Sequence, residues 1–182
     1  MCMSCFECGV ASLAHSLPFL LFSSLLSSFL LLQAHREKEG VQLDGCRCLS
    51  TVCAGCSAAA RLRFVRDGAM DGVLHALSQY PQSEGVVEWA CRTLTDVCSD
   101  ADAKREIMRS RAFDIVLPIV AGVRGAERAY GWSVRFIGEL CTTAERKERA
   151  GAAGLVAVIL EGLVVHEESD AAMQMGLRAL NA

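Results

Sequence analysis

A short motif recurs four times in this chain at a nearly constant spacing. Each copy carries a small residue, an apolar residue, an arginine and, two positions later, a second apolar residue, and the copies span residues 44–49, 89–94, 132–137 and 175–180. Their arginines lie 45, 43 and 43 residues apart. A helical period of about 40–47 residues is typical of solenoids, in which each unit buries its apolar face only by stacking on its neighbours. The repeat therefore predicts a stack of helical units.

Composition favours an all-α fold. Three prolines and a single asparagine leave few turn and strand signals, whereas the frequent Ala, Leu, Glu and Arg are good helix formers. Hydrophobic residues make up 52% of the chain, which is ample for a core. The net charge is only −3, so no global field draws the protein to nucleic acid, and no nucleic-acid partner is expected.

Three helices are expected in each unit. The chain divides into the third helix of a partial unit at 40–56 and then units at 57–98, 99–141 and 142–182. Within the first full unit we expect helices at 58–66 and 69–79, with Gly68 in the left-handed conformation between them, and a third helix that starts at Ser83 or Glu84. In the next unit, Asp100 or Asp102 is expected to cap the short first helix. Pro118 is expected to kink the middle helix of that unit or to delay its start.

The predicted array is incomplete at both ends. The last unit stops inside its third helix, and an array that ends there exposes an apolar flank. Self-association through these open ends is therefore possible.

The first forty residues allow two interpretations. Residues 1–15 are predicted to be disordered, and Cys2, Cys5 and Cys8 within them lack a fourth ligand at a short, fixed spacing. Residues 19–32 contain only Leu, Phe and Ser, so the segment 16–39 is either a signal peptide or membrane anchor, with membrane contact through 16–34, or a buried middle helix of a partial unit. The second interpretation follows from the repeat, because residues 28–32 lie 45 positions before residues 73–77.

The cysteines also follow the repeat. Cys46 and Cys91 share one position of the unit, and Cys53, Cys98 and Cys141 share another. Free cysteines at such positions are predicted to act as small apolar side chains in a reducing compartment. A zinc site at Cys46, Cys48, Cys53 and Cys56 is not expected, because Cys48 points about 200° away from Cys46 on a helix.

From Gly40 onwards the chain resembles the armadillo-repeat proteins. The resemblance rests on the three-helix unit, on Gly68 and more loosely Gly151 or Gly154 between the first two helices, and on the small-apolar-x-x-Leu core of the third helix. Residues 45–49, GCRCL, are similar to the third helices in the armadillo region of leucine-rich repeat kinases and their stand-alone protist and algal relatives. The resemblance implies a right-handed α-solenoid that binds a partner's extended peptide or helix in a concave groove lined by the third helices.

The nuclear-import adaptors of this family carry a Trp and, four residues on, an Asn on the third helix. In this chain the Trp position holds Arg47, Arg92, Arg135 and Arg178, and the Asn position holds Thr51, Asp96 and Glu139. Recognition of a nuclear localisation signal is therefore not expected.

The four arginines are the candidate binding residues. Placed one repeat apart on one face, they can receive carboxylates or phosphates in bidentate fashion. Alternatively, Arg92 pairs with Asp96 and Arg135 with Glu139 at i,i+4, which gives only a weakly stabilising, solvated stripe. Trp89 and Trp132, which are also in register, either pack between units or contact a partner.

The sequence therefore favours a non-catalytic interaction scaffold. The chain contains no H-E-x-x-H, Walker A, dinucleotide-binding or nucleophile-elbow motif, and we expect neither an enzyme, a cofactor nor a metal. We expect a cytoplasmic protein that binds an acidic or phosphorylated segment of a protein partner. The alternative is a membrane-anchored or secreted helical protein that uses residues 19–32 as its anchor or signal.

Overall fold

The computed structural model describes residues 30–181, and this part of the chain folds into helices without any strand. Residues 30–34 form a helical segment. It is followed by α2 (Glu39–Gly55), α3 (Ala58–Arg66), α4 (Ala69–Gln79), α5 (Glu84–Val97), α6 (Ala101–Arg109), α7 (Ala112–Gly122), α8 (Glu127–Leu140), α9 (Ala144–Ala152), α10 (Leu155–Val165) and α11 (Asp170–Leu180).

These helices agree closely with the helices expected from the sequence. α3 and α4 have the expected bounds, and α5 starts at Glu84. Of the two expectations for Pro118, a late start of the helix was wrong, because α7 begins at Ala112 and contains the proline in its interior. Pro118 is exposed, so its ring lies on the outer side of the helix and does not interrupt the core.

Local signals explain where the first two helices of each unit begin. Gly68 (φ 83°) and Gly154 (φ 74°) adopt the left-handed conformation before α4 and α10, so Gly154 rather than Gly151 is the counterpart of Gly68. Asp100 caps α6, as expected, by accepting hydrogen bonds from the backbone N–H groups of Asp102 and Ala103. These residues make the chain turn sharply between short helices.

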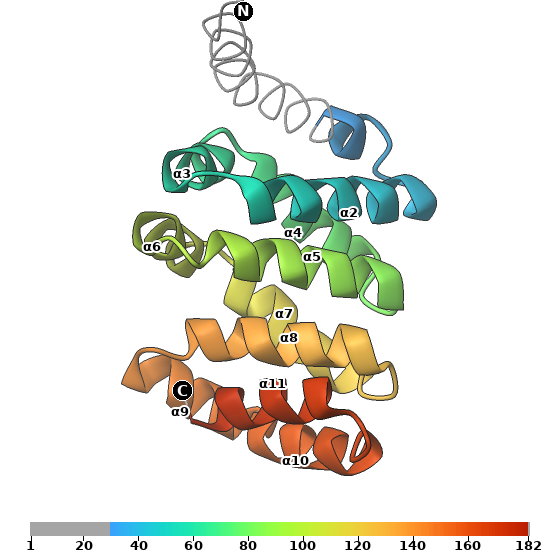
Figure 1. Cartoon of the computed structure of the whole chain (residues 1–182), viewed down its shortest axis with the longest axis vertical. Helices are drawn as coiled ribbons and strands as arrows, with labels where there is room; N and C mark the ends of the chain where they lie inside the picture. The colour runs from blue at the N-terminus through green and yellow to red at the C-terminus, as the bar shows by residue number, and fades with distance from the viewer. Residues whose placement is uncertain (1–29, 182) are drawn as a thin grey trace, which may run out of the picture.

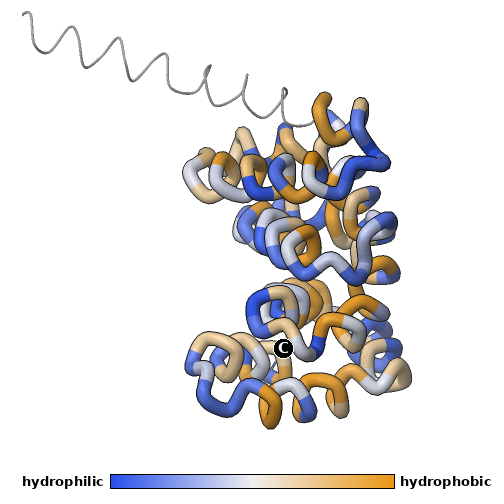
Figure 2. The backbone as a smooth tube through the Cα atoms, turned by 90° about the vertical axis from the view of Figure 1, so that its right-hand side faces the viewer, coloured by the Kyte–Doolittle hydropathy of each residue, from blue (hydrophilic) through white to orange (hydrophobic). Residues whose placement is uncertain are grey.

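Corresponding helices of successive units stack on one another. The third helices α2, α5, α8 and α11 lie side by side in one row (Figure 1), and each packs on the next. The first helices α3 and α6, and the second helices α4, α7 and α10, also pack on their counterparts. Figure 2 shows the same array from the side. The described chain is thus an all-helical array of stacked repeats, and we call the row of α2, α5, α8 and α11 the third-helix face.

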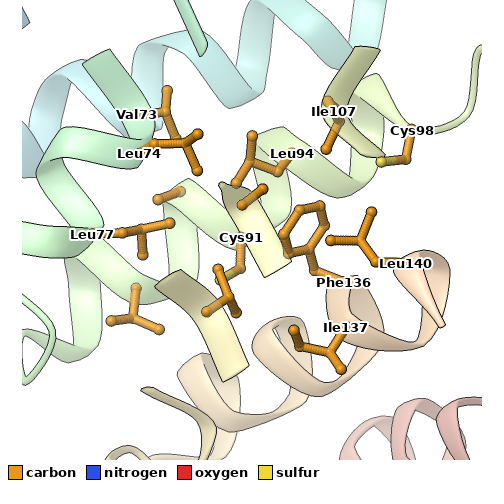
Figure 3. Close-up of a cluster of buried hydrophobic side chains, with 14 of the residues drawn as sticks. Val73, Leu74, Leu77, Cys91, Leu94, Cys98, Ile107, Phe136, Ile137 and Leu140 are labelled. Carbon is orange, nitrogen blue, oxygen red and sulfur yellow. The ribbon is translucent and has the colours of Figure 1, made fainter. Parts of the chain in front are cut away.

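The core is continuous between units. Figure 3 shows one cluster in which side chains of α4, α5, α6 and α8 meet. The two apolar residues of the motif are fully buried in the first three units, as Cys46 and Leu49, Cys91 and Leu94, and Val134 and Ile137. In the last unit their counterparts Leu177 and Leu180 are 50% and 36% exposed. Within the described chain no further helix covers α11, which leaves this surface open.

Leu32 occupies a repeat position at the other end of the array. Its side chain is buried against Gly45 of α2, where an added Cβ would lie 2.5 Å from Leu32 Cδ2. Leu163 of α10 contacts Gly176 of α11 in the same way. The Gln42 side chain of α2 also ties the segment 30–35 to α2. Its Nε2 donates to the carbonyl oxygens of Leu32 at 3.0 Å and His35 at 2.9 Å.

Most of the apolar N-terminal segment lies outside the described residues. This applies to the segment 1–15 with Cys2, Cys5 and Cys8, and to residues 16–29 of the expected anchor or buried helix. Among residues 30–181, no helix combines the length and the apolar character that a membrane span requires. Both interpretations of the N-terminal segment therefore stay predictions.

Candidate binding site on the third-helix face

The cysteines are buried as expected and serve packing. Cys46, Cys53, Cys91, Cys98 and Cys141 are all buried free thiols. Burial raises the pKa of Cys46, Cys53 and Cys98 to about 12, so these thiols stay protonated near neutral pH. Cys48 is exposed, on the opposite side of α2 from Cys46. Within the described range, no three His, Cys, Asp or Glu side chains are grouped so that they could hold a metal ion.

Tryptophan and arginine side chains alternate across α5 and α8. The guanidinium carbon of Arg92 lies 5.1 Å from the ring centroid of Trp89, on its own helix, and 5.2 Å from that of Trp132, on the next unit. The guanidinium carbon of Arg135 lies 5.2 Å from the ring centroid of Trp132, on its own helix. Each such contact is worth about 0.5–1 kcal/mol when exposed and about 2 kcal/mol when desolvated. We call Trp89, Arg92, Trp132 and Arg135 the Trp–Arg stack.

The stack replaces the ion pairs that were the alternative expectation. No ion pair joins Arg92 to Asp96 or Arg135 to Glu139 in the described structure, because the neighbouring tryptophans hold both guanidinium groups. Glu139 Oε2 instead pairs with Lys104 Nζ of α6 at 2.7 Å. The structure thus shows neither of the two expected i,i+4 ion pairs, although the charge of Arg92 still acts on Asp96. The Arg92 guanidinium group packs on rings from two helices.

Arg92 and Asp96 each keep a buried polar atom without a hydrogen-bond partner. These atoms are Arg92 Nε and Asp96 Oδ2. Burial raises the pKa of Asp96, and the positive charges of Arg92, Arg135 and Arg61 oppose the shift. A buried donor or acceptor without a partner costs about 1–3 kcal/mol, so the free protein carries unmet hydrogen-bonding capacity at the centre of the face.

A second contact joins α5 to α8 beside the stack. Arg128 Nη2 lies 2.7 Å from Glu88 Oε1, and its guanidinium carbon lies 6.0 Å from the Trp89 ring centroid. Glu88 is buried although it is charged, so this pair fixes the edge of the face. Sequence reasoning missed both residues, since they precede the motif and only the stacking of the helices brings them together.

The two outer arginines differ from the inner pair. Arg47 pairs with Asp44 at 3.3 Å, and both side chains are exposed. Asp44 occupies the position that holds tryptophan in the next two units, so Arg47 has no ring beside it. Arg178 is exposed on α11 and lines a pocket together with Arg135. The structure therefore connects Arg92, Arg135 and Arg178 along the face and leaves Arg47 apart.

The Trp–Arg stack is suited to recognition more than to chemical catalysis. A guanidinium group that is packed between rings keeps the N–H donors on its edge for a carboxylate, a phosphate or a backbone carbonyl. Comparisons with protein-family models, curated proteins and solved structures find no match for this chain. The candidate site is therefore defined by its own geometry.

Proposed function

We propose that this chain is a cytoplasmic, non-catalytic scaffold of the armadillo type, and that an extended segment of a protein partner binds across its third-helix face. The armadillo type is supported by the period of the motif, by the three-helix units and by the left-handed Gly68 and Gly154. The partner segment is acidic or phosphorylated, because an arginine recurs at the same position of all four third helices.

The observation that carries the proposal is the Trp–Arg stack. Trp and Arg dominate the residues whose truncation costs most at protein interfaces, and they act best when they are held rigidly. Arg92 is held between two rings, so little side-chain entropy remains to be lost when a partner binds. A partner that supplies an acceptor and a donor near Arg92 and Asp96 would also satisfy groups that the free protein leaves without partners.

Selection of peptides tests the proposal. A degenerate library of extended peptides is selected on the immobilised protein, and the dissociation constant of the selected peptides is then measured for the Arg92→Gln variant. We expect the variant to bind about tenfold or more weakly, because an arginine at the centre of an interface contributes 2 kcal/mol or more.

Arg66→Gln is the matched control, because it removes the same charge from an exposed position on α3, away from the third-helix face. The control should bind and melt like the original protein. The Arg92→Gln variant should stay folded but melt at a lower temperature, because it loses the contacts with both tryptophan rings. Equal binding by the Arg92→Gln variant and the original protein would contradict a binding site centred on the stack.

We also propose that a second copy of the chain covers the open apolar surface of α10 and α11. Val156, Leu160 and Val164 lie along one side of α10 at i,i+4 spacing, and each is at least half exposed. The counterpart of Leu160 on α7 is Leu117, which faces α10 across a small apolar cavity.

Sedimentation experiments test this second proposal. We expect self-association that increases with protein concentration, and we expect the Leu160→Glu variant to lose it. A monomer at all concentrations would contradict it.

A further inference from the structure

A second feature of the third-helix face is a pocket beyond the Trp–Arg stack. Its cavity volume is about 280 Å³, and residues of α6, α8 and α11 line it together with Thr142, which lies between α8 and α9. Sites for whole small molecules span roughly 300–1,000 Å³, so this pocket is suited to a single charged group.

The pocket has an excess of positive charge. Its charged residues are Lys104, Arg135, Arg178 and Glu139. The Lys104–Glu139 ion pair neutralises one cation. Neither Arg135 nor Arg178 has a carboxylate partner in the described structure, so two positive charges remain. The Thr142 hydroxyl adds a further donor, because it contacts only the weak acceptor Met108 Sδ at 3.8 Å.

The same charges occur one repeat earlier. Arg61, Arg92 and Arg135 all act on Asp96, and their counterparts one repeat later are Lys104, Arg135 and Arg178 around Glu139. The difference lies in two small residues. Where the earlier unit has Thr95 and Phe136, the pocket has Gly138 and Ala179.

Gly138 also sets the distance between the two arginine-bearing helices. A Cβ at Gly138 would lie 3.0 Å from Ala179 Cα, so any other residue would force α11 away from α8. The pair of small residues thus opens the cavity and keeps Arg135 and Arg178 on its rim together. Arg135 is oriented by the Trp132 ring below it.

We propose that this pocket binds the phosphoryl group of a phosphorylated side chain in the partner segment. A phosphorylated serine carries a charge of about −1.5 to −2 at pH 7, which matches the two unpaired guanidinium groups, whereas a carboxylate would neutralise only one. Arginine forks bind phosphate oxygens in bidentate fashion. This inference rests on the proposed function, because the stack must hold the segment whose phosphorylated residue enters the pocket.

The test compares three degenerate peptide libraries that carry serine, aspartate or phosphoserine at the central position, and inorganic phosphate alone. Binding to the full chain is measured by fluorescence polarisation for the peptides and by calorimetry for phosphate. We expect the phosphoserine library to bind about tenfold or more tightly than the serine library, with the aspartate library between them.

Two variants then locate the effect. Arg178→Gln removes one unpaired charge, and Ala179→Phe keeps every charge but fills the cavity with the side chain that the earlier unit carries. Both should bind the phosphoserine and serine libraries equally. Arg47→Gln is the matched control, since it changes the arginine of the same repeat position at the distant end of the face, and it should keep the preference.

The outcomes separate the two proposals. Binding of all three libraries with equal affinity would overturn the phosphoryl pocket and leave the scaffold in place. A phosphoserine preference that survives in both variants would also overturn it. Binding of inorganic phosphate that Arg178→Gln abolishes, without binding of any peptide, would support the pocket and contradict the scaffold.

Discussion

Phe136→Ala is expected to lower the free energy of unfolding by about 3–5 kcal/mol, as for other buried aromatic residues that are truncated to alanine. The Phe136 side chain is fully buried, and its ring lies in the cluster that α8 forms with Leu94 of α5 and Ile107 of α6 (Figure 3). The lost contacts therefore belong to the interface between two units. Since units of a solenoid are stabilised largely by their nearest neighbours, the loss should affect both sides of the interface.

Urea unfolding followed by circular dichroism measures this effect. Val165→Ala is the control, because Val165 is 56% exposed at the end of α10 and its truncation should change the stability by less than about 0.5 kcal/mol. Similar losses in the two variants would show that the interface between α5 and α8 does not hold the array together.

Gly162→Ala is the second change with a large expected effect. A Cβ at Gly162 of α10 would overlap the ring of Tyr130, which is fully buried on α8. The Tyr130 hydroxyl donates to the carbonyl oxygen of Ile159 at 2.7 Å, and this hydrogen bond opposes a movement of the ring. We expect a loss of about 1–3 kcal/mol from overpacking, and about 1 kcal/mol more if the hydrogen bond breaks.

Gly151→Ala makes the same chemical change but is expected to raise the free energy of unfolding. Gly151 lies in α9, and nothing stands within 4 Å of its added Cβ. Alanine is the better helix former, so this variant should unfold at an equal or higher temperature, with a gain of up to about 1 kcal/mol. Thermal unfolding of the two variants therefore separates packing from helix propensity. If both glycine variants were stabilised, Tyr130 would not be tightly packed.

The helices and their order could be predicted because the same pattern recurs in each unit, so that each copy supports the assignment of the others. The motif repeats with its spacing, and glycine or a capping residue marks the turns at Gly68, Asp100 and Gly154. Burial of the motif's apolar residues also follows from periodicity. The exposure of Leu177 and Leu180 agrees with the expectation that the last helix of the array presents an apolar flank.

The contacts of the candidate site could be predicted only in part. The register of Arg92 and Arg135 with the tryptophans is visible in the sequence, but the choice of Trp132 over Asp96 as the neighbour of Arg92 depends on the distance between α5 and α8. Sequence patterns treat each helix separately and therefore favoured the pair within one helix. The pocket was missed for the same reason, because it depends on the small size of Gly138 where α8 meets α11.

The central claim is that the third-helix face binds a partner segment through the Trp–Arg stack, and the indole N–H resonances test it most directly. The chain has two tryptophans, Trp89 and Trp132, and both belong to the stack. Titration of ¹⁵N-labelled protein with a selected peptide should shift both indole signals in step with binding, because Arg92 contacts both rings. Saturable binding that leaves both indole signals unchanged would place the partner elsewhere and contradict the account.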